Sequence, residues 1–526
     1  MLNTARGLGG MITAPHHLAS EAGLRVLRDG GNAVEAMVAA AAAIAVVYPQ
    51  MNSIGGDGFW LIAEPGRAPV GIDAAGWSAA LATPEFYAAK GLKGIPARGP
   101  AAALNVAGAI SGWKKALEFA GGDLPLARLL EDAVHHASNG VVVSGGQAAL
   151  TAEKFSEIRD VPGFAGTYLV DGVPPRTGQV MTFPALAATL SRLVEAGLDD
   201  FYRGDLARAN AAYLEQVGSP LRFADFEAFM AREVKPMRVK LASGTVYNMP
   251  PPTQGVSSLM ILALFERLGV AEAEGFEYLH GMVEATKQAF LLRNAHLTDL
   301  AFMEVDPNDW LDDGFLDGLA AQIDPRSALE WPQPAKPGDT IWMGAIDADG
   351  MAVSYIQSTY WEFGSAVVAP ETGVVFQNRG HGFTLDPAHP NVLVPHKRPF
   401  HTLNPAMARL NDGRVLSYGT MGGEGQPQTQ AAVFSRYAMF GQELQAAVTA
   451  PRWLLGRTWG EDSTSLKLES RFDPDVVKAL RDAGHTVDEA EPFTSIMGHA
   501  GAVCRHDDGV FEGAFDPRSD GAVGCF

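Results

Sequence analysis

Two apolar runs on either side of a polar turn stand near the start of the last third of the chain. Residues 341–346 and 351–356 are the runs, and Asp347-Ala348-Asp349-Gly350 lies between them. Turn residues flanked by apolar runs predict a β-hairpin. The first strand of this hairpin begins beside Thr340, directly after Lys336-Pro337-Gly338-Asp339. The pattern therefore predicts a hydroxyl-bearing residue at the head of a strand.

Elsewhere the pattern alternates between strand-like and helix-like segments, without internal repeats or low-complexity tracts. Short apolar runs predict strands, and apolar residues that recur every three or four positions predict amphipathic helices. Strands are predicted at 59–62, 70–72 and 414–418, and helices at 17–28, 33–47, 124–138, 184–196 and 428–440. Helices and strands are thus mixed along the whole chain.

The most apolar segment, residues 33–47, is predicted to be a buried helix. It is about 15 residues long and carries Glu35, so it is too short to span a bilayer. Asn32 is the expected N-cap, and Glu35 stands where a capping box needs an acidic residue. Residues 1–17 contain no basic flank followed by an apolar run, so we expect no secretory signal and a cytoplasmic protein.

Composition and charge exclude several classes of function. The chain has 526 residues, 47% of them hydrophobic, which is ample for a large core. Its formal net charge of −20 argues against nucleic acid and against an anionic membrane surface as partners. The two cysteines, Cys504 and Cys525, form no disulfide framework, and their spacing leaves a single pair open. His16 and His17 have no second ligand cluster, so neither a metal nor another cofactor is expected.

Thr340 has the chemistry of an N-terminal nucleophile. Cleavage of the chain before Thr340 would place a free α-amine beside its hydroxyl, so that one residue supplies both nucleophile and base. The pKa of an α-amine is about 7.7 to 8.0, so much of it is available as a base near neutrality. The alternative is an ordinary Asp-Thr pair at a strand start, because Thr is a good strand former.

A glycine-rich segment, Gly419-Thr420-Met421-Gly422-Gly423-Glu424-Gly425, joins a predicted strand to a predicted helix. Such a turn can direct backbone N–H groups at one point, and the helix N-terminus adds positive potential. An amide hydrolase uses this arrangement to stabilise an oxyanion. No Lys-Ser/Thr pair follows, so the segment is not a phosphate-binding P-loop. The alternative is a turn without a catalytic role.

Residues 324–339 contain four prolines and no periodic pattern. We expect an exposed, pliable linker that can rearrange after a cut at Thr340. A plain interdomain connection is the other interpretation.

Several motifs occur in one order along the chain, from the N-terminal region to the glycine-rich segment. They are Gly30-Gly31-Asn32-Ala33-Val34-Glu35-Ala36, Gly55-Gly56-Asp57-Gly58, Asp339-Thr340, Phe363-Gly364-Ser365, Pro395-His396-Lys397-Arg398-Pro399-Phe400-His401-Thr402 and Gly419-Thr420-Met421-Gly422-Gly423-Glu424-Gly425-Gln426-Pro427-Gln428. Together they resemble the γ-glutamyltransferase (γ-glutamyltranspeptidase) family over nearly the whole chain.

The resemblance implies an α+β fold, a four-layer αββα sandwich of the N-terminal nucleophile hydrolase type. It implies a precursor that cuts itself into a large subunit, residues 1–339, and a small subunit, residues 340–526, which together form one intertwined unit. Asp339 would end the large subunit and Thr340 would be the nucleophile. Ser358 would support the α-amine, and Gly422 and Gly423 would stabilise the oxyanion.

The substrate-side residues depart from the family pattern. The Arg that holds a glutamyl α-carboxylate has no counterpart near Ala75 and Trp77, and the carboxylate that holds the α-amine is replaced by Gly382. The segment that contains Gly382 also contains Asn378, and it has Arg379 where the family has Gln or Glu. Two Ser positions that bind the carboxylate in the family are occupied here by His401 and Thr402. Arg379 would repel an ammonium group and bind an anion. Trp77 and Trp361 would narrow the pocket if they face it, although both could be core residues, and Arg379 could belong to a structural ion pair.

This pattern looks like the oxamate amidohydrolase branch, so we expect a small carboxylate-bearing amide that releases ammonia through an acyl-enzyme. One alternative is a γ-glutamyl hydrolase or transferase with a rearranged pocket. The more distant alternative is an uncut, non-catalytic binding protein. The two subunits could also form a dimer.

Overall fold

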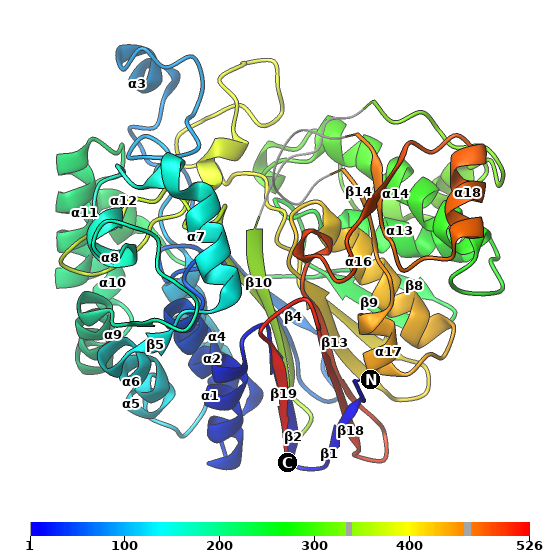
Figure 1. Ribbon diagram of the computed structural model, residues 1–526, viewed down its shortest axis with the longest axis horizontal. Coiled ribbons are helices and arrows are strands. Elements are labelled where there is room, and N and C mark those ends of the chain that lie inside the picture. Colours follow the sequence, from blue (N-terminus) through cyan, green and yellow to red (C-terminus); the bar gives the residue numbers. More distant parts are fainter. Residues whose placement is uncertain (1, 333–338, 457–463) are drawn as a thin grey trace.

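The computed structural model describes residues 2–332, 339–456 and 464–526. Two antiparallel sheets lie face to face in the centre, and a layer of helices covers the outer face of each (Figure 1). This arrangement is the predicted four-layer αββα sandwich.

The first sheet, here called sheet I, has seven strands in the order β19-β2-β10-β11-β3-β4-β7. Every neighbouring pair in it is antiparallel. The strands are β2 (Gly10–Ala14), β3 (Asp57–Ala63), β4 (Val70–Ala74), β7 (Arg232–Val234), β10 (Asp339–Asp347), β11 (Ala352–Tyr360) and β19 (Ala522–Cys525). The predicted hairpin is therefore confirmed as β10 and β11, in the middle of the sheet.

Sheet II also has seven antiparallel strands, in the order β1-β18-β17-β13-β12-β9-β8. They are β1 (Ala5–Gly7), β8 (Met237–Leu241), β9 (Gly244–Asn248), β12 (Ala406–Leu410), β13 (Val415–Thr420), β17 (Ala500–Arg505) and β18 (Phe511–Phe515). Two small sheets lie outside the sandwich: β5 (Val141–Val142) with β6 (Val180–Met181), and β14 (Trp453–Leu455) with β15 (Leu466–Glu469) and β16 (Val487–Ala490).

Helices from the first half of the chain cover sheet I, with α2 and α4 lying directly on it. They are α1 (His17–Arg28), α2 (Ala33–Val47), α3 (Pro84–Ala89), α4 (Ala109–Ala120), α5 (Leu126–Leu129), α6 (Glu131–Asn139), α7 (Gly145–Ile158), α8 (Phe164–Tyr168), α9 (Pro184–Ala196), α10 (Asp200–Arg203), α11 (Asp205–Val217) and α12 (Phe223–Ala228). Helices α13 and α16 lie on sheet II. This layer comprises α13 (Gly255–Arg267), α14 (Phe276–His296), α15 (Asp313–Ala320), α16 (Gly425–Phe434), α17 (Leu444–Thr449) and α18 (Pro474–Asp482).

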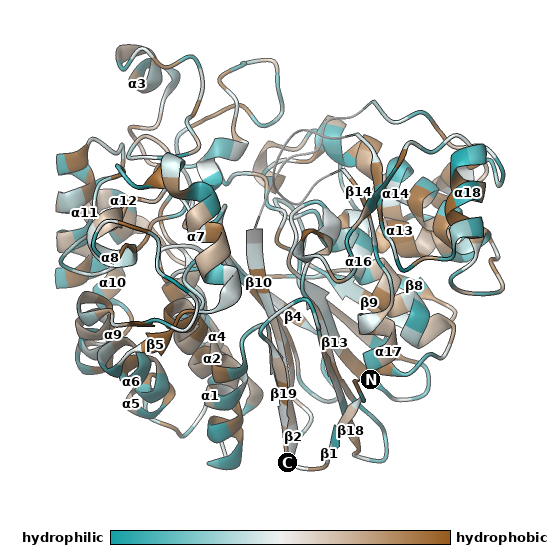
Figure 2. Ribbon diagram, in the orientation of Figure 1, coloured by the Kyte–Doolittle hydropathy of each residue, from teal (hydrophilic) through white to brown (hydrophobic). Residues whose placement is uncertain are grey.

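The two faces of β10 belong to different parts of the core. Ile341 and Met343 pack toward the helices over sheet I, whereas Trp342 and Ile346 lie between the sheets. This alternation follows from the two-residue period of a strand. The strands of the two sheets, and the helices that lie on them, are mainly hydrophobic, whereas the outer faces of the helices carry the hydrophilic residues (Figure 2).

Trp342 brings sheet II close to the head of β10. A Cβ atom on Gly419 would lie 2.3 Å from the Trp342 ring, and one on Gly501 would lie 2.7 Å from it. Both positions therefore require glycine, because a side chain there would displace the indole. This contact sets the end of β13 beside the start of β10.

Most of the predicted elements are confirmed. Helix α2 has the expected bounds, and Asn32 and Glu35 form the expected capping box. The predicted single helix at 124–138 is wrong, because the chain breaks into α5 and α6 at Leu130. Leu129 and Leu130 are both buried, and the break lets these consecutive side chains both reach the core. The predicted helix at 428–440 begins earlier, at Gly425, and ends in a π-helical turn, Ser435–Met439.

Residues 324–332 form neither helix nor strand and are largely exposed, as expected for a linker, while residues 333–338 lie outside the described residues. Cys504 and Cys525 are both free thiols. Among the described helices none is long and apolar enough to cross a membrane. A cytoplasmic location stays a prediction.

Candidate active site

The head of β10 is irregular, and the irregularity lies at Thr340. Asp339 pairs with Tyr360 and Ile341 pairs with Gln357, so two residues of β11, Ser358 and Thr359, lie opposite Thr340 alone. Such a bulge re-aims side chains at the end of a strand pair. Thr340 is completely buried. It lies two residues before Trp342, on the strand face that looks toward sheet II.

Tyr360 completes the bulge in an unusual backbone conformation. Its φ is +86°, in a region that residues with side chains rarely adopt. The Tyr360 N–H donates to Ser358 Oγ at 2.7 Å, and the centre of its ring lies 4.0 Å from the Arg379 guanidinium carbon. The strained residue thus fixes the Ser358 hydroxyl and provides an aromatic face for Arg379.

Arg379 brings a positive charge to this end of the sheet. Its side chain is 1% exposed, and its guanidinium donates to Thr402 Oγ1 at 3.1 Å and to Ser358 Oγ at 3.5 Å. In the described part of the chain no carboxylate lies within ion-pair distance of Arg379, so it does not belong to a structural ion pair there. Burial lowers the pKa of Arg379 to about 10, against the opposing influence of Tyr360 and Asp57, so it stays charged near neutrality.

Asp57 and His401 form a second buried group beside Arg379. Asp57 is the first residue of β3 and pairs with Ser358 of β11, so its side chain lies on the same face as that of Ser358. Asp57 Oδ1 accepts hydrogen bonds from the Gly76 N–H and from Gln377 Nε2, both at 2.8 Å. Asp57 Oδ2 lies 3.1 Å from His401 Nε2, and both side chains are fully buried. Burial raises the pKa of Asp57 to about 7 and, together with Arg379, lowers the pKa of His401 well below its ordinary value.

The glycine-rich turn follows β13, which packs across β10. Gly422 has a φ of +119° and Gly423 a φ of +52°. The carbonyl oxygen of Gly422 accepts from the Gly425 N–H at 2.8 Å, which ties the turn to the start of α16. The turn therefore lies at a helix N-terminus, where backbone N–H groups and the helix dipole favour negative charge.

Gln254 links this turn to the segment that holds His401 and Thr402. Its Nε2 donates to the carbonyl oxygens of Thr402 and Gly423, at 2.8 and 2.9 Å. Arg293 holds Gln254 Oε1 at 2.9 Å and Glu424 Oε1 at 3.0 Å. These bonds fix the turn relative to the Arg379 group through side chains that lie far apart in the sequence.

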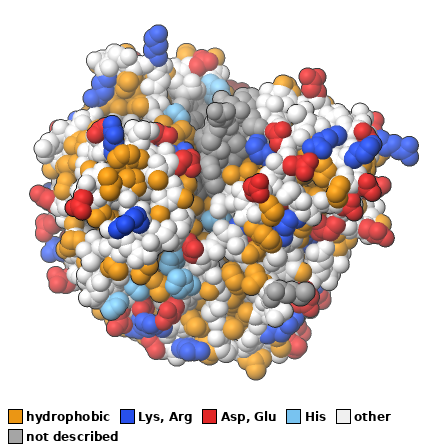
Figure 3. Space-filling view, in the orientation of Figure 1, with side chains coloured by type: hydrophobic (Ala, Val, Ile, Leu, Met, Phe, Trp, Pro, Cys, Tyr) orange, Lys and Arg blue, Asp and Glu red, His pale blue; other side chains and the backbone are white. Residues whose placement is uncertain are grey.

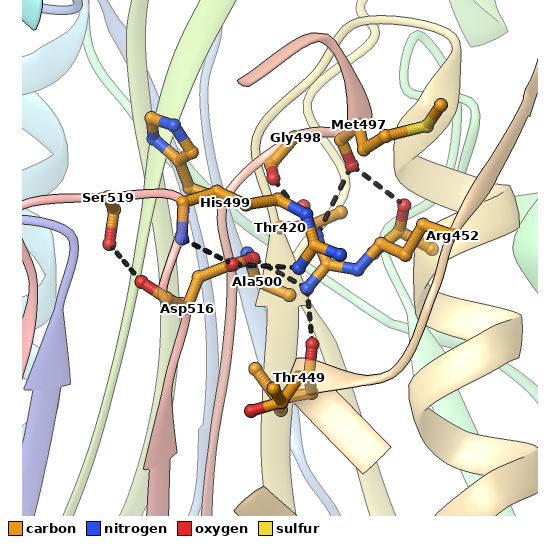
Figure 4. A network of polar contacts seen from close by, with 12 residues as sticks. Thr420, Thr449, Arg452, Met497, Gly498, His499, Ala500, Asp516 and Ser519 are labelled. Carbon is orange, nitrogen blue, oxygen red and sulfur yellow. Dashed lines mark hydrogen bonds and ion pairs between the residues drawn. The ribbon is translucent and has the colours of Figure 1, made fainter. Parts of the chain in front are cut away.

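A buried ionic network lies beside Thr420, where the glycine-rich turn begins (Figure 4). Arg452 donates to the carbonyl oxygens of Met497 and Gly498 at 3.2 and 3.0 Å, and its other guanidinium nitrogen bonds Asp516 Oδ2 at 2.5 Å. The next residue, His499, accepts the Met421 N–H at 3.1 Å through its carbonyl oxygen. The position of the glycine-rich turn thus depends on Arg452 and Asp516.

Comparison with known proteins decides the family. The gamma-glutamyltranspeptidase family matches residues 19–526. The chain belongs to this family. It is therefore an enzyme, an amidohydrolase with the N-terminal nucleophile hydrolase fold, and the predicted family and fold are confirmed.

Relatives of this gamma-glutamyltranspeptidase family member carry several names. The chain is 54% identical to the oxamate amidohydrolase proenzyme of Klebsiella pneumoniae, over 98% of each chain. It is 40% identical to the glutathione hydrolase-like YwrD proenzyme of Bacillus subtilis, again over 98% of each. The crystal structure of a cephalosporin acylase from Bacillus halodurans superposes with a TM-score of 0.93 at 32% identity, covering 100% of this chain and 97% of that one.

Within this gamma-glutamyltranspeptidase fold, most of the expected site residues come together. Thr340, Ser358, Arg379 and Thr402 lie in one set of contacts, with the turn that contains Gly422 and Gly423 joined to Thr402 through Gln254. The catalytic and binding roles of these residues stay predictions.

Asn378 and Trp77 occupy different surroundings. The Asn378 amide is engaged by backbone, accepting from the Trp361 N–H at 3.1 Å and donating to the Ala97 carbonyl oxygen at 2.8 Å. It therefore orients the segment that carries Arg379. Trp77 packs against Phe229, and its ring also contacts His396 and Arg398. A substrate contact by either residue stays a prediction.

One group of described residues has the composition of a cation site. His280, Glu284 and His485 are buried, and their ligand atoms lie within 4.8 Å of one another. The Lys287 ammonium already lies 2.7 Å from Glu284 Oε1, and the His280 and His485 rings are hydrogen-bonded to each other at 2.9 Å. Lys287 thus supplies the positive charge that Glu284 needs.

Asp57, Gln254 and Tyr360 were not predicted as site residues. Asp57 was visible only as a carboxylate inside Gly55-Gly56-Asp57-Gly58, directly before an apolar run. Gln254 and Tyr360 give no such signal, because Gln254 acts through hydrogen bonds to segments far away in the sequence and Tyr360 through a positive φ.

Proposed function

We propose that the protein cleaves itself between Asp339 and Thr340 and then hydrolyses a small amide with a carboxylate beside the scissile carbonyl. Oxamate is the first candidate. The observation that carries the proposal is the buried Arg379 guanidinium, which contacts Ser358 beside Thr340 and has no carboxylate partner among the described residues. A buried charge without a counter-ion is costly, so an anionic ligand is the natural partner.

The positive charge of Arg379 also argues against a substrate that places a free α-amino group beside it. An ammonium group close to Arg379 would meet a like charge in a water-excluded site. A carboxylate would instead accept parallel hydrogen bonds from the planar guanidinium. The 54% identity to the Klebsiella oxamate amidohydrolase proenzyme supports the same substrate class.

Cleavage comes first in the proposed mechanism. The Thr340 hydroxyl attacks the carbonyl carbon of Asp339, and an N-to-O acyl shift gives an ester with a free Thr340 amine. Water then opens the ester, which leaves Asp339 with a C-terminal carboxylate and Thr340 with both groups free. The bulge opposite Ser358 and Thr359 supports this step, because it departs from regular pairing at the peptide bond that is cut.

Substrate hydrolysis uses the same hydroxyl. Thr340 Oγ attacks the amide carbonyl while its own α-amine takes the proton. The Gly422 and Gly423 N–H groups stabilise the oxyanion, and the α-amine returns the proton to the leaving ammonia. Water then hydrolyses the oxalyl ester, so that oxamate and water give oxalate and ammonia.

A γ-glutamyl hydrolase or transferase is the second candidate, and the 40% identity to the Bacillus subtilis glutathione hydrolase-like proenzyme favours it. Two assays separate the candidates: ammonia release from oxamate, and amine release from a γ-glutamyl anilide. The first reaction alone is expected.

The decisive experiment is the intact mass of the purified protein under denaturing conditions. We expect two chains, residues 1–339 and 340–526, and a single uncut chain in Thr340→Ala, which should also release no ammonia. Thr340→Ser keeps a hydroxyl and should still be cut. An uncut wild-type chain that does not turn over either substrate would instead favour the binding-protein alternative.

A further inference from the structure

Four buried polar atoms next to Thr402 have no hydrogen-bond partner among the described residues. They are Arg379 Nε, His401 Nδ1, and the two atoms Asp57 Oδ2 and His401 Nε2, which lie 3.1 Å apart without forming a regular hydrogen bond. Buried polar atoms in native proteins are almost always hydrogen-bonded, so a group of unsatisfied ones requires an explanation. A bound ligand is the direct one here, because the three side chains belong to one contiguous group.

The charges of this group decide which ligand it accepts. With Asp57 ionised and His401 neutral, the Asp57 carboxylate cancels the Arg379 charge, and the group is neutral overall. An anion brought into it would then face the buried carboxylate. With one proton on the Asp57–His401 pair, the group carries a net positive charge and matches a single carboxylate.

We propose that the Asp57–His401 pair takes up one proton when the substrate carboxylate binds beside Arg379. The proton comes from solvent and is returned when the product leaves, so no other reactant is required. This inference rests on the proposed function, since it deepens the account of how that same site admits a carboxylate. Asp57 is thereby a positioning and specificity-determining residue, which acts through the charge of the group.

Burial favours a proton on Asp57 near neutrality. Burial, which outweighs the hydrogen bonds from Gly76 and Gln377 and the charge of Arg379, raises the pKa of Asp57 to about 7. The other titratable or charged groups around the pair are Asp73 of β4, Arg398, Tyr360 and Tyr355 of β11 and Tyr202 of α10. Asp73 raises the pKa of Asp57 further, while Arg398 helps to keep His401 neutral.

The test measures the proton directly. Oxalate, the expected product, is titrated into the cleaved wild-type protein by calorimetry at pH 8, in phosphate and in Tris, whose ionisation enthalpies differ strongly. Uptake of close to one proton per oxalate is expected. Oxalate that does not bind, or that binds with the same heat in both buffers, overturns the inference.

Two variants locate the proton. Asp57→Asn should bind oxalate without proton uptake, and its KM for oxamate should rise much less steeply with pH than that of the wild type, which should rise about tenfold per pH unit above neutrality. Asp73→Asn removes the neighbouring buried carboxylate and should keep both the uptake and the slope. Identical slopes in the wild type and Asp57→Asn would contradict the assignment to Asp57.

Failure of the proposed function gives a different result. If oxamate releases no ammonia but oxalate still binds with proton uptake that Asp57→Asn abolishes, the substrate is wrong and the inference stands. If oxamate is hydrolysed and no proton is taken up, the function stands and the inference is wrong.

Discussion

Arg379 is buried and makes no ion-pair contact with a carboxylate among the described residues, so its contributions to stability and to binding should have opposite signs. A charge without a partner destabilises the folded state, whereas a carboxylate ligand gains from it. Thr402 and Ser358 hydrogen-bond the guanidinium through neutral hydroxyl groups, and the Tyr360 ring lies against it.

Arg379→Gln should therefore lower kcat/KM for oxamate by about a hundredfold or more, since it removes a hydrogen-bonded charge, while the melting temperature stays at or above that of the wild type. Arg379→Lys keeps the charge but loses the planar pair of donors, so we expect an intermediate loss, mainly in KM. Steady-state kinetics and thermal melts of the three proteins test this. A large fall in melting temperature for Arg379→Gln would show that the arginine is structural.

The two glycines of the turn should respond differently to a methyl group. Gly423, at a φ of +52°, lies in the left-handed region, where alanine is strained by about 1 to 2 kcal/mol. Gly422, at a φ of +119°, lies outside that region, so alanine must move the backbone. Gly422→Ala should reduce kcat by about a hundredfold or more with little change in KM, as for loss of an oxyanion donor, and Gly423→Ala should reduce it less. An unchanged kcat in both variants would place the oxyanion site elsewhere.

At the residue scale, a site residue can be predicted from the sequence when the residues next to it in the chain indicate its role. Thr340 is found because a hydroxyl precedes a hairpin strand, and Gly422 because glycines join a strand to a helix. Asp57 and Tyr360 could not be found this way. Their roles depend on burial, on the register of β3 against β11 and on a positive φ, none of which local sequence specifies.

At the scale of elements, the glycine-rich turn depends on ion pairs that lie outside the sheets' hydrophobic core. Arg452 and Asp516 hold the Met497–Gly498 backbone, and Arg518 bonds both Asp516 and Glu469. Removing one partner from such a buried network leaves an unpaired charge, which is strongly destabilising.

Asp516 should make part of the stability depend on acid pH. Burial alone would raise its pKa, but Arg452 and Arg518 outweigh burial and lower it to about 2. Because the folded pKa lies below the unfolded value of about 3.9, the stabilisation is complete above pH 4 and is lost as the pH falls toward 2, by about 2 to 3 kcal/mol. Asp516→Asn should melt lower than wild type at pH 7 and show a shallower loss between pH 4 and 2.

Asp482→Asn is the matched control, because it removes the same charge from an exposed pair with Lys478. Its melting curve should follow that of the wild type at every pH. An unchanged acid dependence in Asp516→Asn would contradict the role assigned to the network.

Element boundaries were predictable where residues at the helix ends mark them. Helices α1, α2 and α9 have their expected bounds: Asn32 caps α2, and α9 begins at Pro184 and ends before Gly197. The break between α5 and α6 was missed, since it depends on which side chains the tertiary contacts bury. The order of the strands in the sheets could not be derived from the pattern, because their neighbours are far apart in sequence.

At the scale of the whole molecule, a cut before Thr340 would not divide the fold. Five strand pairs join residues before the cut to residues after it: β19–β2, β2–β10, β11–β3, β1–β18 and β12–β9. Acidic and basic side chains are interspersed on the surface face seen in Figure 3, so no patch of one sign on that face would drive two halves apart.

The cleaved protein should therefore migrate as one species of undiminished size in gel filtration, at low and high salt alike. Denaturant should separate it into its two chains. Thr340→Ala, as an uncut control, should elute at the same volume. Dissociation of the cleaved wild type in high salt would show that its halves are held by surface charge rather than by shared sheets.

The shared sheets also change the molecularity of folding. An uncut chain can refold by itself, at a rate independent of concentration. After the cut, the same sheets can reform only when two separate chains meet, so renaturation becomes second order and competes with aggregation of exposed strands. Cleavage would thus make unfolding effectively irreversible. The working lifetime of the enzyme would be set by how slowly it unfolds, because two chains that have separated seldom reassemble.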